Sequence, residues 1–352
     1  MKFMSLKNHF KWNLVGSLVP LAIGFFSIPI LIEKLGLELF GILTLLWALI
    51  GYFSLFDFGL SRALTQIIAK YNKEKNKCDI YVSIGISIIF YLGLVAALII
   101  TLVSAFVPMQ LLGVGEQNVY DVKCSLLIAA VGIPMTTLTT GCRGVLEGFF
   151  EFKRSNILKV YLGIGNFLFP VIAVLFFDAN LVNVTLSLII VRLIVLIVSF
   201  KEAFNFFNFK VYSFIEYGKV VRDLMSFGSW MTVSNIVSPL MVTSDRFFLA
   251  TFAGASVVSF YTVPFEIVIR ALIIPAALTS AFFPYISKLL LENKDATYKI
   301  YKEKIKIVMA MMVAISICLI SFSKVFLTLW IDEEFSNNSW IIMSVLSIGI
   351  VF

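Results

Sequence analysis

Nine apolar runs lie along this 352-residue chain, and their length constrains its fold more than any other feature. An α-helix needs about 20 mostly apolar residues to cross the hydrocarbon of a bilayer. A water-soluble core could not hide so much apolar sequence. We therefore expect nine membrane-crossing helices. They are predicted at residues 12–32, 40–63, 80–107, 122–143, 157–177, 181–200, 226–250, 257–287 and 305–328.

The composition agrees with a bilayer as the main solvent. Hydrophobic residues make up 60% of the chain and charged residues 14%, whereas soluble domains carry about 25% charged residues. A tenth apolar run begins near Trp340 and is too short to cross before the sequence stops at Phe352, so we expect the natural protein to continue. The first run lacks a small-x-small cleavage site, which indicates a transmembrane helix instead of a signal peptide.

Basic side chains gather in every second loop, and the loops between them are short and lean acidic. Because Lys and Arg collect on the cytoplasmic side, this alternation predicts a cytoplasmic N-terminus. It also assigns the net charge of +7 to membrane topology, so we expect no nucleic-acid partner. The basic regions hold Lys2, Lys7, Lys11, then Lys70, Lys73, Lys75, Lys77, then Lys153, Arg154, Lys159, then Lys201, Lys210, Lys219, Arg222, then Lys288, Lys294, Lys299, Lys302, Lys304 and Lys306.

An internal repeat is indicated by a shift of 218 residues, which places Trp12 on Trp230 and Gly36 on Gly254. Such a shift spans six predicted helices, so two like bundles would run parallel. We predict an all-α membrane protein with an N-terminal six-helix bundle and a second bundle that is apparently truncated. The predicted boundaries are 1–203 for the first bundle, 204–225 for a cytoplasmic linker and 226–352 for the incomplete second bundle. The linker interleaves Phe and Tyr with polar residues and is expected to lie on the inner membrane surface.

Sequence motifs of enzymes are absent. The chain has no P-loop, no GxSxG and no HExxH motif. Its four cysteines are scattered, and its single His9 has no partner of ligating type nearby in the sequence. We therefore expect no catalytic residues, no metal and no cofactor, and we expect the protein not to be an enzyme.

Charged residues inside the apolar runs are the candidate functional residues, because they are costly in a membrane and persist where they face a partner or a wet cavity. Arginine can hold two oxygens of a phosphate at once. The candidate substrate-binding residues are therefore Arg192, Arg246 and Arg270. The candidate charge partners or coupling-ion residues are Asp57, Asp245 and Glu266. Charges also lie near the inner helix ends, at Arg62, Arg143 and Glu147.

Structural alternatives stay open for two of these sites. Arg192 could be paired with an acid such as Asp57. Glu266 and Arg270 are four residues apart in the favourable order for an intrahelical salt bridge. Pro264 and Pro275 bracket that pair and permit kinks beside it.

Two stretches of the chain are similar to a known family. Pro29, Leu35-Gly36, Phe40-Gly41, Asp57-Phe58-Gly59-Leu60 and Ala63 in the first stretch, and Ser244 to Val268 followed by Phe282 to Leu289 in the second, resemble the polysaccharide flippases. These Wzx-like O-antigen and capsule transporters belong to the multidrug/oligosaccharidyl-lipid/polysaccharide exporter superfamily. The resemblance implies two bundles around a central cationic cavity, alternating access, and normally at least twelve helices.

The function that the resemblance implies is translocation of an undecaprenyl-pyrophosphate-linked oligosaccharide repeat unit from the cytoplasmic to the outer leaflet of the bacterial plasma membrane. Expected partners are the lipid-linked oligosaccharide, the bilayer, and a polysaccharide polymerase with its export machinery. Three alternatives are weighed beside it. They are a cation-coupled multidrug exporter of the same superfamily, a flippase for another polyprenyl-linked cell-wall precursor, and a membrane-embedded sugar transferase.

Overall fold

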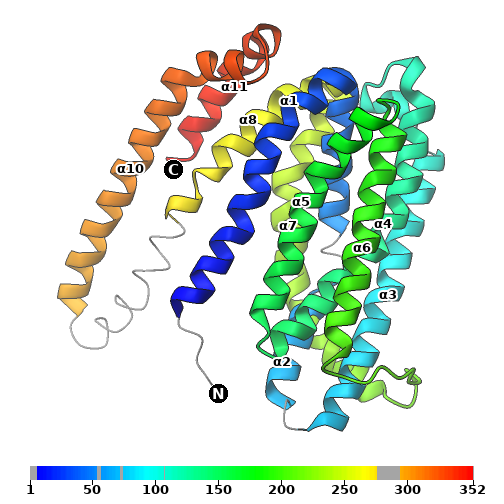
Figure 1. The fold of residues 1–352 in the computed structure, drawn as a ribbon. Helices are drawn as coiled ribbons and strands as arrows, with labels where there is room; N and C mark the ends of the chain where they lie inside the picture. Colours follow the sequence, from blue (N-terminus) through cyan, green and yellow to red (C-terminus); the bar gives the residue numbers. More distant parts are fainter. Residues whose placement is uncertain (1–5, 54–56, 72–73, 107, 276–293, 352) are drawn as a thin grey trace. The chain divides into compact units, whose positions relative to one another are not determined.

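The computed structural model describes residues 6–53, 57–71, 74–106, 108–275 and 294–351, and all the regular secondary structure within them is helical (Figure 1). The predicted all-α membrane fold is confirmed. The α-helices are α1 (Leu6–Phe53), α2 (Leu60–Tyr71), α3 (Lys75–Phe106), α4 (Val119–Gly148), α5 (Phe152–Phe176), α6 (Leu181–Phe204), α7 (Gly218–Ala253), α8 (Ala255–Arg270), α10 (Lys294–Trp330) and α11 (Glu333–Gly349). Two short 3₁₀ helices, η1 (Met109–Leu112) and η2 (Glu116–Asn118), lie between α3 and α4.

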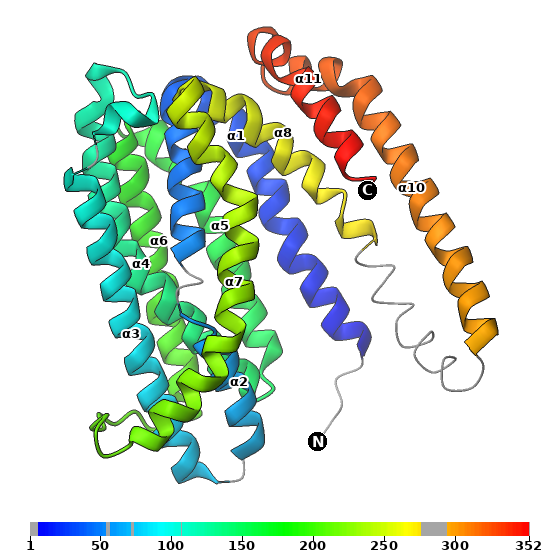
Figure 2. The same cartoon turned by 180° about the vertical axis from the view of Figure 1, so that it is seen from behind.

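Gly36 divides α1 into two helical segments. Its φ of 78° and ψ of 165° are not helical, and this region is open almost only to glycine. Figure 2 shows the blue chain rising to this point and then running back down. The two predicted stretches 12–32 and 40–63 lie on opposite sides of this glycine, and the second includes both the end of α1 at Phe53 and the start of α2 at Leu60, with a turn at residues 57–59.

Seven helical stretches of the described chain are long and apolar enough to cross a membrane, and α1 is counted among them as one. The protein is therefore a multi-pass membrane protein. The last helix begins at Glu333, ahead of the apolar run that starts near Trp340, because the Asp332 carboxylate accepts a hydrogen bond from the Phe335 N–H at 2.7 Å and caps it. The predicted crossing at 257–287 is described only as far as Pro275, and its remainder lies outside the described residues.

The chain forms two compact units, Met1–Ser256 and Val257–Phe352. In the first unit, α4 packs against α2, α3 and α6, and α1 packs against α5. On α2, the apolar residues Leu60, Ala63, Leu64 and Ile68 are fully buried. The predicted linker at 204–225 falls within this unit, because α7 also packs on α1, α2 and α3. The division into two six-helix bundles stays a prediction.

In the second unit, α10 and α11 lie side by side. Buried serines join them: Ser316 Oγ donates to the Ser347 carbonyl at 2.6 Å, and Ser336 Oγ donates to the Lys324 carbonyl at 2.9 Å. Small polar residues of this kind are common where membrane helices pack closely.

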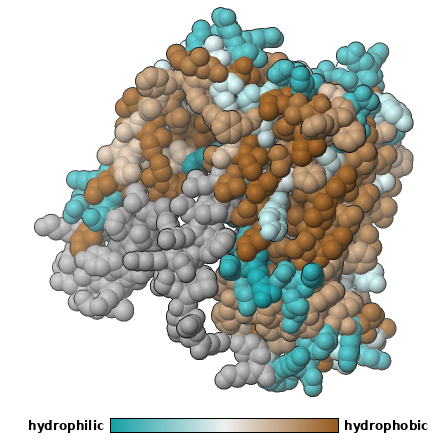
Figure 3. All heavy atoms as spheres, in the orientation of Figure 1, coloured by the Kyte–Doolittle hydropathy of each residue, from teal (hydrophilic) through white to brown (hydrophobic). Residues whose placement is uncertain are grey.

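The exterior of the first unit suits a lipid environment. Figure 3 shows hydrophobic side chains over the faces of α5 and α6, with hydrophilic side chains gathered toward the ends. Exposed apolar residues include Leu168 and Leu175 on α5 and Ile190, Leu193 and Ile197 on α6. Soluble proteins rarely expose so much apolar surface, so lipid is expected to cover these faces.

The two ends of the first unit differ in their connections. At one end, the Glu38 carboxylate accepts hydrogen bonds from the Gly115 N–H at 2.8 Å and from Asn118 Nδ2 at 3.0 Å. At the other end lie the connections α2–α3, α4–α5 and α6–α7, which carry the Lys and Arg residues of the sequence pattern. We call this second end the basic end.

Candidate functional site

Arg192 lies in the middle of α6 and is buried, with 4% of its surface exposed. Its helix begins cleanly because the Asn180 side chain caps it by accepting from the Asn183 N–H at 2.8 Å. The guanidinium Nη1 donates to the Leu188 carbonyl one turn earlier at 2.9 Å, and Nε has no hydrogen-bond partner within the described chain. A Cβ built on Gly132 of α4 would lie 3.3 Å from Arg192 Cδ, so a glycine makes room for this side chain.

The alternative that pairs Arg192 with Asp57 is wrong. The two carboxylate oxygens of Asp57 accept the backbone N–H groups of Gly59 at 2.9 Å and Ser61 at 3.2 Å. Asp57 therefore caps the start of α2, where these N–H groups have no helical partner. The chain reaches this position through positive φ angles at Phe58 and Gly59. No ion pair joins Arg192 to a carboxylate among the residues described here.

Asp245 and Arg246 both lie on α7 in the first unit. Arg246 is buried, with 7% of its surface exposed, and Asp245 is partly buried. The Asp245 carboxylate accepts a hydrogen bond from the Arg246 backbone N–H at 2.8 Å. Two charged residues at neighbouring positions of an apolar helical stretch are costly inside a membrane, which keeps this segment among the candidates.

Glu266 and Arg270 lie on α8 in the second unit and form the expected intrahelical salt bridge. Arg270 Nη2 donates to Glu266 Oε2 at 2.9 Å, and both side chains are partly exposed. The third candidate arginine thus belongs to a different unit from Arg192 and Arg246. Their convergence on one ligand stays a prediction.

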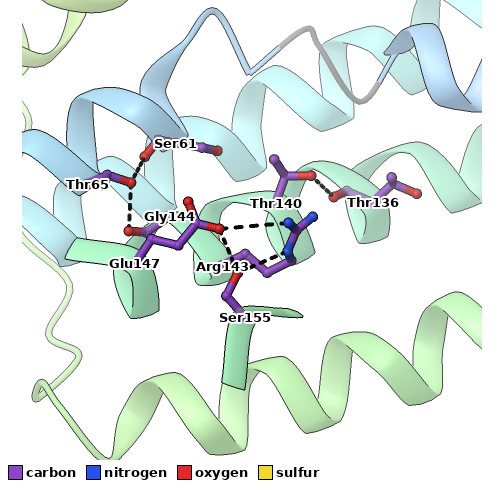
Figure 4. A network of polar contacts seen from close by, with 8 residues as sticks. All are labelled: Ser61, Thr65, Thr136, Thr140, Arg143, Gly144, Glu147 and Ser155. Atoms are coloured by element: carbon purple, nitrogen blue, oxygen red, sulfur yellow. Dashed lines mark hydrogen bonds and ion pairs between the residues drawn. The ribbon is translucent and has the colours of Figure 1, made fainter. Parts of the chain in front are cut away.

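A polar network at the basic end of the first unit joins α2, α4 and α5 (Figure 4). The Ser155 hydroxyl donates to Glu147 Oε1 at 2.6 Å and accepts from Arg143 Nε at 3.3 Å. Arg143 Nη2 lies 3.8 Å from the same Glu147 oxygen. Thr65 Oγ1 completes the link to α2 with a 2.9 Å bond to the Gly144 carbonyl.

Sequence reasoning identified Arg143 and Glu147 but not the hydroxyls that connect them. The four-residue spacing of Arg143 and Glu147 was a usable signal, because such residues share a helix face. Ser155 lies across the α4–α5 turn, and nothing in its local sequence marks it. Within the described chain, no cluster of His, Cys, Asp and Glu could hold a metal ion.

Comparison with known proteins assigns the chain to a family. Residues 6–290 match the model of the family described as polysaccharide biosynthesis protein. The chain belongs to this family. A relative in Shigella flexneri, described as a candidate O-antigen transporter, is 31% identical over 99% of this chain and 82% of its own length. A Bacillus subtilis relative, the uncharacterized membrane protein EpsK, is 24% identical over 95% of this chain and 67% of its own length.

Solved structures show that this member of the polysaccharide biosynthesis family has the fold of the multidrug/oligosaccharidyl-lipid/polysaccharide exporters. An inward-facing multidrug transporter of that superfamily aligns with a TM-score of 0.71 at 15% identity, covering 96% of this chain and 81% of that chain. A Pyrococcus furiosus transporter of the superfamily, whose binding pocket is described as reversed in polarity, aligns with a TM-score of 0.54 at 16% identity, covering 96% and 74%. The resemblance expected from the sequence is confirmed.

Proposed function

We propose that the protein is a flippase for a lipid-linked oligosaccharide. It moves an undecaprenyl-pyrophosphate-linked repeat unit from the cytoplasmic to the outer leaflet of a bacterial plasma membrane by alternating access. Family membership and the Shigella flexneri relative, described as a candidate O-antigen transporter, support this proposal. The protein supplies a path for the headgroup and makes or breaks no covalent bond.

Arg192 is the observation that carries the proposal. An arginine at the centre of a membrane helix costs about 2.5 to 3.5 kcal/mol on insertion scales. Arg192 carries this cost with one hydrogen bond to its own helix and no carboxylate partner among the described residues. A pyrophosphate group would supply the missing acceptors, because guanidinium and phosphate oxygens form paired charge-assisted hydrogen bonds. Arg246, on α7 of the same unit, would add positive charge to the site.

The placement in the cell follows from the charge pattern. Because the basic end carries the Lys and Arg residues, it faces the cytoplasm, and the N-terminus lies on the same side. The substrate enters from the cytoplasmic leaflet, where its sugars are assembled. A polysaccharide polymerase and its export machinery take the product on the outer side.

The test uses a strain in which the chromosomal copy is deleted and variants are expressed from a plasmid. Arg192→Ala should abolish surface polysaccharide and lead to accumulation of the lipid-linked repeat unit at the cytoplasmic leaflet. Arg192→Lys should retain part of the activity, because lysine keeps the charge but cannot bind two oxygens in a plane. Arg62→Ala is the matched control, since Arg62 is exposed on α2.

Wild-type polysaccharide levels in Arg192→Ala, with the variant present in the membrane, would overturn the assignment. The deletion strain also tests the alternative function, a cation-coupled multidrug exporter. Deletion should leave drug susceptibility unchanged if the substrate is an anionic lipid-linked sugar. A broad increase in susceptibility to cationic drugs together with normal polysaccharide would favour the exporter instead.

A further inference from the structure

The segment 205–217, which we call the α6–α7 linker, has one side packed into the first unit. Phe207 is buried within the apolar cluster formed with α2, α3 and α4. Phe206 stacks on Phe149 at a centroid distance of 5.4 Å. Tyr212 and Tyr217 pack against the same cluster and contact each other. The linker is therefore part of the folded unit.

Polar contacts fix the linker against the start of α3. The Asn208 N–H donates to Asp79 Oδ1 at 3.2 Å, and the Lys210 N–H donates to Ser83 Oγ at 3.2 Å. Just beyond the linker, the Tyr81 hydroxyl donates to an Asp223 carboxylate oxygen at 3.0 Å. Both cartoon views place this loop beside α3 at the basic end (Figures 1 and 2).

The opposite side of the linker presents apolar side chains outward. Ile215 is 94% exposed and Val211 87% exposed, and Phe214 is also exposed. A loop that contacts only water does not usually hold several large apolar side chains in exposed positions. Three basic residues lie in or just after the linker: Lys210, Lys219 and Arg222. Between Lys210 and Arg222 the sequence holds one acidic residue, Glu216. Basic residues beside exposed apolar ones are typical of a segment that binds an anionic membrane surface.

The position of α3 in the bilayer sets the depth of the linker. With 32 residues at 1.5 Å per residue, α3 is about 48 Å long, whereas the hydrocarbon is about 30 Å thick. Its exposed large apolar side chains begin at Phe90 and continue to Phe106. Counting about 30 Å back from Phe106, which is about 20 residues of helix, places the edge of the hydrocarbon near Ser87. The part of α3 before Ser87 therefore lies outside the hydrocarbon, on the side of the basic end.

One contact connects the linker to this boundary. The ring of Phe214 meets the ring of Tyr91 edge to face, with 6.0 Å between centroids. Tyr91 is 55% exposed and belongs to the lipid-facing part of α3. The linker thus continues the lipid-facing surface of the helix at the level where hydrocarbon meets headgroups.

We propose that the α6–α7 linker is a membrane-interface anchor. Val211, Phe214 and Ile215 insert at the boundary between headgroups and acyl chains of the leaflet at the basic end. Lys210, Lys219 and Arg222 bind anionic lipid headgroups beside them. The anchor holds the first unit at a fixed depth, independently of which substrate the protein carries.

The test measures the depth of the linker in nanodiscs that contain phosphatidylglycerol. Val211→Cys and Ile215→Cys are prepared in a Cys318→Ser background, because Cys318 is exposed, and are labelled with the environment-sensitive dye NBD. Lys75→Cys, at the exposed start of α3, is the aqueous control. Leu98→Cys, on the lipid-facing part of α3, is the deep control.

The dye at positions 211 and 215 should emit at a shorter wavelength than the dye at position 75. Lipids that carry a quencher near the headgroup should quench the dye at 211 and 215 about twofold or more strongly than the dye at 75. Replacing phosphatidylglycerol with neutral phosphatidylcholine should reduce this difference. Emission and quenching equal to those at position 75 would overturn the proposal. Carbene footprinting of the unsubstituted protein in nanodiscs provides an independent measurement. The peptide containing Val211 and Ile215 should be shielded from labelling. If this peptide is labelled as strongly as a water-exposed peptide, the proposal is also overturned.

Discussion

Gly36 and Gly254 adopt nearly the same unusual backbone conformation, although they lie far apart in the sequence. Their φ and ψ angles are 78° and 165° for Gly36, and 96° and 159° for Gly254. Each residue lies between two helical segments, within α1 and between α7 and α8 respectively. These are the positions that the 218-residue shift superimposes. The shared geometry supports an internal repeat in which equivalent glycines turn the chain between the first two helices of each half.

Substituting Gly36 with alanine should destabilise the protein by backbone strain alone. A Cβ at Gly36 would have no neighbour within 4 Å, so no clash contributes. The conformation is open almost only to glycine, and forcing another residue into it costs about 1 to 3 kcal/mol. Gly254→Ala should behave alike, since its nearest neighbour, Gly113 O, would be 4.0 Å away. Thermal unfolding in detergent, followed by size-exclusion chromatography, measures the loss.

Gly51→Ala is the matched control for the two hinge variants. Gly51 lies in the helical part of α1, and its added Cβ would also meet nothing within 4 Å. Because alanine is about 1 kcal/mol more favourable than glycine inside a helix, this variant should be neutral or more stable. Equal stability of Gly36→Ala and Gly51→Ala would contradict the strain argument.

The close approach of α2 to α4 at Gly144 leads to a second prediction. A Cβ at this position would lie 2.4 Å from the Ser61 carbonyl oxygen, which is backbone and cannot rotate away. Gly144→Ala should therefore push α2 from α4, lengthen the Thr65–Gly144 hydrogen bond, and cost about 1 to 3 kcal/mol. Gly218→Ala, where the added Cβ is free, provides the control. Hydrogen exchange of the α2 amides should rise in Gly144→Ala and stay unchanged in Gly218→Ala.

The membrane architecture could be predicted from the sequence because it depends on the length of apolar runs and on loop charge. Burial of Arg192 followed from the same logic, since a mid-helix guanidinium cannot reach either surface. The turn at residues 57–59 could not be predicted, because 40–63 was interpreted as a single apolar crossing and the positive φ angles of Phe58 and Gly59 leave no apolar pattern.

Helix caps were the signals that sequence reasoning overlooked. Asp57 lies just before the start of α2 and accepts hydrogen bonds from the Gly59 and Ser61 N–H groups. From the sequence alone it is interpreted as a charge inside the membrane, although Asp is a preferred N-cap residue. Asp332 precedes Glu333 and Glu334 in the same manner and marks the start of α11. Contacts across the chain, such as that of Ser155 with Glu147, depend on packing and leave no local pattern.

Asp57 variants separate capping from ion coupling. Asp57→Ala removes both acceptors and should cost about 0.5 to 2 kcal/mol of stability. Asp57→Asn keeps a side-chain carbonyl for one of the two N–H groups, so its stability should lie between those of alanine and wild type. Because the proposed role is structural, Asp57→Asn should still support surface polysaccharide. Loss of polysaccharide in Asp57→Asn at normal stability would instead indicate a coupling carboxylate.

The Glu266–Arg270 pair permits a sharper separation of structural and functional roles. An intrahelical pair with accessible side chains contributes about 0.3 to 0.5 kcal/mol, so Arg270→Gln should change stability by no more than this. If Arg270 contacts the pyrophosphate, the same variant should nevertheless lose most of its surface polysaccharide. Glu266→Gln is the control, because it breaks the salt bridge and leaves the guanidinium available. It should keep or increase transport, and equal loss in both variants would show that the pair matters only as a pair.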